Sequence, residues 1–71
     1  MHSSITSIEA ITNSGADGKV VCGVTINMLD GAYAFDLFEF DADYSQEGIK
    51  RTLQKLYDTD APVYIDGEKV K

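Results

Sequence analysis

One stretch constrains the fold more than any other, an expected β-hairpin over residues 19–41 that turns at Asp30 and Gly31. On its first arm, apolar residues occupy alternate positions over residues 20–28, which is the period of a half-buried strand. Asp-Gly between two such arms favours a two-residue type I′ turn, because both central residues of that turn need positive φ. The chain is therefore expected to build an antiparallel sheet around this hairpin.

A two-residue loop fixes the cross-strand partners of the return arm. Leu29 then faces Ala32, Met28 faces Tyr33, Ile26 faces Phe35 and Val24 faces Leu37. Beyond Leu37, strict alternation puts Phe38 and Phe40 on the opposite face together with Val21. A bulge near Leu37 or Phe38 would return both phenylalanines to the core. The two alternatives differ in whether these aromatic side chains form an apolar patch on the back of the sheet.

The segments on either side of the hairpin indicate another strand and a helix. Residues 4–12 are rich in Ile and Thr and favour a strand. Their Ile residues recur at every third position and Thr6 with Glu9 resembles a helix capping box, which leaves helix as the alternative. Ser45 is expected to cap a helix over about residues 46–58, because the apolar positions there fall on one face.

These elements together predict an α+β fold of order β-β-β-α-β. An antiparallel three-stranded meander spans about residues 4–12, 19–29 and 32–41, and the helix over about 46–58 covers one of its faces. A short strand over 63–65 runs parallel to the first and third strands, and a charged tail follows it. Residues 1–71 are expected to form one domain, because a chain of this length has room for a single core.

Charge and composition argue against several classes of protein. Twelve acidic residues against six basic ones give a net charge of −6, which disfavours direct contact with nucleic acid or with anionic membranes. No apolar run approaches the roughly 20 residues of a membrane helix, and no signal peptide is apparent. Cys22 is the only cysteine and has no intramolecular partner, so the cytoplasm is the expected compartment.

No catalytic site or cofactor site is expected. The only histidine is His2, near the start of the chain, and Cys22 lies in the middle of a strand. A nucleophile with a base in reach is therefore not indicated. The glycines at residues 15–18 lack the spacing of a phosphate-binding loop and lead into a strand.

An acidic segment after the hairpin partly resembles a calcium-binding loop. Asp41, Asp43 and Glu47 follow the spacing of the front half of an EF-hand loop. Gln46 stands where that loop needs glycine, and Thr52 stands where it needs a bidentate Glu. No metal site is therefore expected, and weak binding of a divalent cation is kept as a second alternative function.

The return arm and its exit are the expected functional surface. Aromatic residues alternate there with acids, and residues 30–47 contain no Lys, Arg or His. Aromatic side chains anchor protein interfaces, and carboxylates steer a basic partner. The expected interaction residues are Val21, Asp36, Phe38, Glu39, Phe40, Asp41 and Asp43.

The sequence therefore predicts a small acidic protein-interaction module without enzymatic activity, of a regulatory or adaptor kind. Its expected partner is a protein, either basic or nucleic-acid-binding, and a homodimer through the sheet is one form that the module could take. The first alternative is an inhibitor of the phage or mobile-element type, which mimics nucleic-acid phosphates in the groove of a nucleic-acid-binding protein. Binding of that kind weakens steeply with salt.

Overall fold

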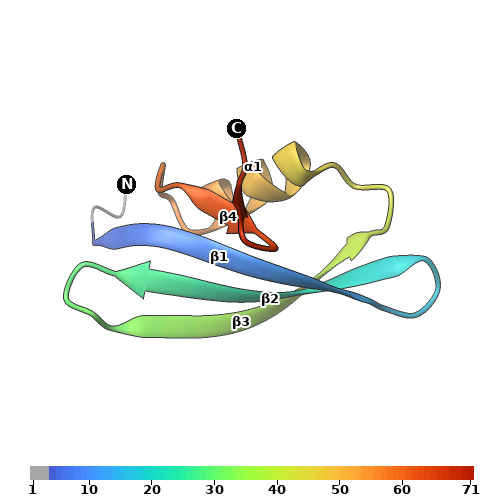
Figure 1. Cartoon of the computed structure of the whole chain (residues 1–71), viewed down its shortest axis with the longest axis horizontal. Helices are drawn as coiled ribbons and strands as arrows, with labels where there is room; N and C mark the ends of the chain where they lie inside the picture. The colour runs from blue at the N-terminus through green and yellow to red at the C-terminus, as the bar shows by residue number, and fades with distance from the viewer. Residues whose placement is uncertain (1–3) are drawn as a thin grey trace.

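The computed structural model describes residues 4–71, which form a mixed sheet of five strands and one helix (Figure 1). In chain order the elements are β1 (Ile5–Ser14), β2 (Lys19–Met28), β3 (Tyr33–Asp41), α1 (Gln46–Leu56), β4 (Val63–Ile65) and β5 (Glu68–Lys69). The order across the sheet is β3-β2-β1-β4-β5. The strands β1, β2 and β3 pair antiparallel, whereas β4 runs parallel to β1. The expected α+β meander with one helix and a short C-terminal strand is confirmed.

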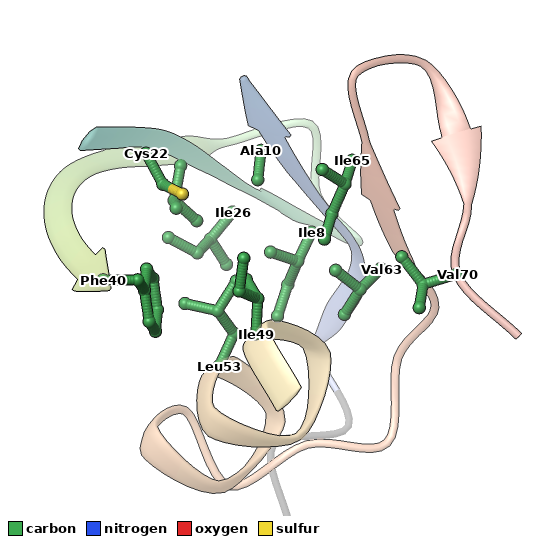
Figure 2. Close-up of a cluster of buried hydrophobic side chains, with 11 residues drawn as sticks. Ile8, Ala10, Cys22, Ile26, Phe40, Ile49, Leu53, Val63, Ile65 and Val70 are labelled. Atoms are coloured by element: carbon green, nitrogen blue, oxygen red, sulfur yellow. The ribbon is translucent and has the colours of Figure 1, made fainter. Parts of the chain in front are cut away.

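The helix α1 begins at the expected cap and covers one face of the sheet. The Ser45 hydroxyl accepts a hydrogen bond from the backbone N–H of Gly48 at 3.0 Å, which satisfies one of the free donors of the first turn. Ile49 and Leu53 point from the helix toward the strands, as Figure 2 shows. The helix ends at Leu56, slightly earlier than expected, because Tyr57 leaves the helical region as the C-cap.

The hydrophobic core lies between α1 and the facing side of β1, β2 and β4 (Figure 2). Leu53 is fully buried there, and Phe40 closes one end of the core at the exit of β3. The core residues are Ile8, Ala10, Cys22, Val24, Ile26, Phe40, Ile49, Leu53, Val63, Ile65 and Val70. The opposite side of the sheet has no layer of residues 4–71 packed against it.

Residues 5–14 form a strand, which decides between the two alternatives for this segment. The pairing of β1 with β2 shifts register between Ile5 and Ser7, as a β-bulge does. Ile5 and Ile8 therefore both pack on the core side despite their odd spacing, whereas Ile11 lies on the other face and is 64% exposed. The bulge therefore reconciles the three-residue spacing of Ile5 and Ile8 with a strand.

The expected two-residue turn at Asp30 and Gly31 is wrong. The N–H of Met28 donates to the carbonyl of Ala32 at 2.9 Å, and the N–H of Gly31 donates to the carbonyl of Met28 at 3.0 Å. The loop therefore has three residues, 29–31, of which Gly31 alone has positive φ, at 88°. This is a type I turn followed by one left-handed residue, a common three-residue hairpin loop.

The longer loop corrects the expected partners of β3 by one residue. Phe35 faces Thr25, not Ile26, and Leu37 faces Gly23, not Val24. The corrected partners are Ala34 for Ile26, Asp36 for Val24, Phe38 for Cys22 and Phe40 for Val20. A slip of one residue moves every side chain of a strand to the other face. Phe38 and Phe40 therefore turn toward the helix without the bulge proposed near Leu37.

The charged tail forms a further strand that the sequence analysis missed. Asp66 and Gly67 both have positive φ, 51° and 88°, so they make the two-residue turn that was expected at the other Asp-Gly. Behind this turn β5 pairs antiparallel with β4, and Val70 is buried. The Asp66 carboxylate accepts a hydrogen bond from the backbone N–H of Thr12 at 2.9 Å, which ties the hairpin to β1.

Candidate functional site

The face of the sheet opposite α1 carries a continuous apolar patch. The side chains of Ile11, Tyr33, Phe35 and Leu37 lie on it and are between 61% and 72% exposed. With that much of four large side chains in water, the patch presents on the order of 500 Å² of apolar surface. Patches of this size are at the upper end of what monomeric proteins leave exposed and often mark interaction sites. We call these four residues the open-face patch.

Gly23 makes the open-face patch continuous across three strands. It is the Cα partner of Ile11 on β1 and of Leu37 on β3, so the three residues form one row. A Cβ atom at Gly23 would lie 3.1 Å from Cζ of Phe35 and 3.9 Å from Cδ2 of Leu37. Both side chains therefore lean over the glycine toward β1. Beside this row, Glu9, Ile11, Thr25, Tyr64 and Gly67 help to line a groove of about 320 Å³.

The strand β3 forms one margin of the sheet and exposes its backbone there (Figure 1). Its ladder with β2 is framed by hydrogen bonds that involve Ala32 at one end and Ala42 at the other, both of which face β2. Backbone groups of successive residues in a strand point to opposite sides. The even-numbered residues of β3 therefore bond to β2, and the N–H and C=O groups of Tyr33, Phe35, Leu37 and Glu39 point to the free edge.

Negative charge surrounds this free edge. Residues 20–49 contain six acidic side chains and no Lys, Arg or His. Asp41, at the end of β3, forms a salt bridge with Lys19, whose Nζ lies 2.5 Å from Asp41 Oδ1. Glu47 on α1 forms one within the helix, where Arg51 Nη2 lies 2.5 Å from Glu47 Oε1. The hydrogen bond to Asp41 raises the pKa of Lys19. Asp36 and Glu39, nearer the middle of β3, alternate with the exposed apolar residues and keep the edge acidic.

The seven expected interaction residues divide between two faces. Phe40 is 9% exposed and its ring centroid lies 5.3 Å from that of Tyr44, while Phe38 packs edge-on against Tyr57 at 6.2 Å. The alternative that placed both phenylalanines on the back of the sheet is therefore wrong. On the back face the structure brings together Val21, Glu39 and Asp41 from the expected set, whereas Asp36 lies on the helix side and Asp43 lies in the exposed segment after β3.

Sequence reasoning missed the open-face patch. Its β3 residues, Tyr33, Phe35 and Leu37, are placed on the core face by the two-residue loop that the sequence favours. One signal could have corrected this: a three-residue loop puts Phe38 and Phe40 opposite Cys22 and Val20 on the core side, whereas a two-residue loop without a bulge leaves both on the back of the sheet.

A carboxylate on the helix side of β3 is held by a tyrosine. The hydroxyl of Tyr57 donates to Oδ2 of Asp36 at 3.2 Å. Burial, and then the hydrogen bond to the Asp36 carboxylate, raise the pKa of Tyr57 from 10.0 to about 12. A charge placed on the inner side of an edge strand discourages pairing with a like strand. Asp36 therefore disfavours pairing of this edge with a second copy of the same strand.

The phenol of Tyr57 should lose its proton only at high pH. We expect Tyr57 to ionise near pH 12 when its ring resonances are followed by NMR during a pH titration. The folded protein holds this proton while the unfolded chain loses it near pH 10, so Tyr57 contributes stability below pH 10 that is lost as the pH rises toward 12.

The variant Asp36→Asn separates the two causes of this shift. Without the carboxylate, the pKa of Tyr57 should fall toward 10 but stay above it, because burial of the ring remains. Glu39→Gln is the matched control on the other face of β3 and should leave Tyr57 unchanged. Ionisation of Tyr57 near pH 10 in the folded wild type would contradict the contact.

Nucleophilic catalysis would depend on Cys22 or His2, and metal binding on a group of several ligands. Cys22 is buried, and burial raises the pKa of its thiol. Residues 4–71 contain no group of three or more potential ligands that could hold a metal ion, and no helix among them is long and apolar enough to cross a membrane. His2 lies outside the described residues.

Comparisons of the chain with protein-family models, with curated proteins and with solved structures give no match. The functional argument for this protein therefore rests on its own surface. The features that call for an explanation are the open-face patch, the free edge of β3 beside it and the negative charge around both.

Proposed function

We propose that this protein is a small non-enzymatic interaction module that binds another protein chain with the uncovered face of its sheet. The observation that carries this proposal is the open-face patch, four large apolar side chains that are 61–72% exposed on one continuous surface. A chain of 71 residues buries only about 60% of its unfolded surface, so it has little apolar area to leave unused. An interface on this face recovers that area.

The surroundings of the patch fit a regulatory or adaptor role. Aromatic and aliphatic residues at the centre with charged residues around them is the usual anatomy of a protein interface. A net charge of −6 favours a basic partner over an acidic one. A buried, unpaired Cys22 is compatible with the reducing cytoplasm as the working compartment.

No observation on the structure specifically favours either alternative function. A phosphate mimic needs several carboxylates that are free to meet a basic groove, but Asp41 and Glu47 already pair with cations of this chain. The calcium-like segment uses two of the same paired acids. The interaction module is therefore the function that we carry forward.

The double variant Phe35→Ser with Leu37→Ser tests the proposal. Proteins that bind the wild type are captured by cross-linking in an extract of the native host, identified and purified, and their affinity is then measured by calorimetry. We expect the double variant to weaken such binding by at least about tenfold, because exposed aromatic and aliphatic anchors carry most interface energy. Light scattering on the same samples reports whether a second copy is the bound chain.

Leu56→Ser is the matched control. Leu56 is a comparably exposed leucine, at 58%, but it lies on α1, away from the uncovered face. The control should bind like the wild type. Equal binding by the wild type, the double variant and the control would show that the open-face patch is not the interface.

A further inference from the structure

We infer that the partner adds a strand to the free edge of β3, antiparallel to it, and that this strand carries Lys or Arg among apolar residues. The inference rests on the proposed function and specifies the partner's chemistry. Strand addition at this edge needs three properties in one place. These are backbone N–H and C=O groups without partners in the sheet, an apolar surface that reaches the edge, and charged side chains that select the incoming strand.

The backbone of β3 provides the first property. Nine residues, Tyr33–Asp41, form an edge strand, and the N–H and C=O groups of Tyr33, Phe35, Leu37 and Glu39 point away from β2. Native proteins usually shorten, cover or interrupt such an edge. Within residues 4–71 no segment covers this one. Strand addition uses main-chain hydrogen bonds for affinity and side-chain pairs for specificity.

The side chains of β3 specify the second and third properties. Partner residues opposite Phe35 and Leu37 lie on the open face beside the patch and should be apolar. The residue opposite Glu39 lies on the same face and should be Lys or Arg. The residue opposite Asp36 lies on the helix side, and it should also be basic. Read from its amino terminus, the incoming strand therefore follows the order cation, any residue, apolar residue, cation, apolar residue.

A second copy of this chain fits the edge poorly. Antiparallel pairing of two β3 strands brings Asp36, Glu39 and Asp41 of both copies to one junction. Like charges on adjacent strands are destabilising. The nearest cation on the neighbouring strand is Lys19, which already binds Asp41 at 2.5 Å. Charge therefore selects a basic strand over a copy of this one.

A synthetic peptide tests the inference on the intact protein. The probe is acetyl-Thr-Arg-Thr-Val-Lys-Val-Thr-amide, which places Arg opposite Glu39, its first Val opposite Leu37 and its Lys opposite Asp36. We expect binding in calorimetry or NMR titration that weakens as salt rises from about 0.05 M to about 0.5 M. Shift changes should concentrate on β3 and on the open-face patch. The peptide with Glu in place of Arg and Lys should bind at least about tenfold more weakly.

Methylation of single peptide nitrogens tests the pairing itself. The N–H of the first Val points toward β3 in the proposed register, so its methylation should weaken binding by about tenfold or more. The N–H of the Lys points away from β3, and its methylation should change affinity by less than about threefold. Equal effects of the two methyl groups would overturn strand addition.

Variants of the protein provide the complementary test. Leu37→Pro removes an N–H that faces the free edge and leaves the ladder with β2 intact, so the protein should fold but lose the peptide. Leu37→Thr shortens the same side chain and keeps the N–H, so it should retain part of the affinity. If Leu37→Pro unfolds the protein, the methylated peptides still decide the question.

The outcomes separate this inference from the proposed function. Loss of a captured partner in Phe35→Ser with Leu37→Ser, together with no response to the peptide, overturns strand addition and leaves the interaction module standing. If the protein forms a dimer that Leu37→Pro abolishes, the strand bound at this edge belongs to a second copy of the chain. That result also overturns the inference of a basic partner strand. Discrimination between the basic and acidic peptides, together with unequal effects of the two methyl groups, supports the inference.

Discussion

Phe40→Ala should lower the free energy of unfolding by about 3 kcal/mol, whereas Phe35→Ala should change it by no more than about 0.5 kcal/mol. Phe40 is 9% exposed and packs on Tyr44 at the end of the core, so its removal leaves a cavity. Phe35 is 61% exposed on the other face. Urea denaturation followed by circular dichroism measures both values.

This pair of variants also tests the register of the β2–β3 hairpin. With the two-residue loop that the sequence favoured, and without a bulge, Phe35 would lie opposite Ile26 in the core and Phe40 would lie on the back of the sheet. The order of the two effects would then be reversed. A larger loss for Phe35→Ala would therefore contradict the three-residue loop and the open-face patch.

The two Asp-Gly pairs show what local sequence can and cannot specify. Asp66 and Gly67 form the two-residue turn that this dipeptide favours, while Asp30 and Gly31 belong to a three-residue loop. The local preference for the shorter turn is the same at both sites. At the longer hairpin, the burial of Phe38 and Phe40 against α1 requires the other register. Tertiary packing, which the dipeptide does not encode, selects the loop.

The strand β2 and the helix α1 were predictable because the first has a periodic pattern and the second has a cap. The alternation in β2 and the cap at Ser45 are local signals, and both elements form where they were expected. The bulge between Ile5 and Ser7 and the two-residue strand β5 depend on the neighbouring strands β2 and β4. No window of the sequence alone contains those neighbours.

The candidate site was predictable in charge but not in position. The acidic character of the return arm follows from composition, and it holds in any register. Which aromatic residues reach solvent depends on whether the hairpin loop has an even or an odd number of residues. One residue more in the loop moves every side chain of β3 to the other face. The expected surface and the open-face patch therefore share the strand β3, but Phe38 and Phe40 pack on the helix side. The free edge of β3 additionally required the strand order, which places β4 beside β1 and leaves β3 at the margin.

Leu53→Ala should cost about 2–5 kcal/mol of unfolding free energy, and Leu56→Ala should cost less than about 1 kcal/mol. Both substitutions lie on α1, but Leu53 is fully buried in the core and Leu56 is 58% exposed. Both replace a leucine by the residue with the highest helix propensity, so the difference reports packing rather than helix formation. A domain of this size has only a few kcal/mol to lose.

Detachment of α1 should also lower the pKa of Tyr57, which contacts the edge strand β3. Tyr57, the C-cap of α1, donates to Asp36 on β3, so a helix that detaches in Leu53→Ala releases this contact. The pKa of Tyr57 should then move from about 12 toward 10, whereas Leu56→Ala should leave it unchanged. An equal loss of stability in the two variants would mean that α1 does not seal the core. An unaltered Tyr57 in a destabilised Leu53→Ala would mean that the edge is held independently of the helix.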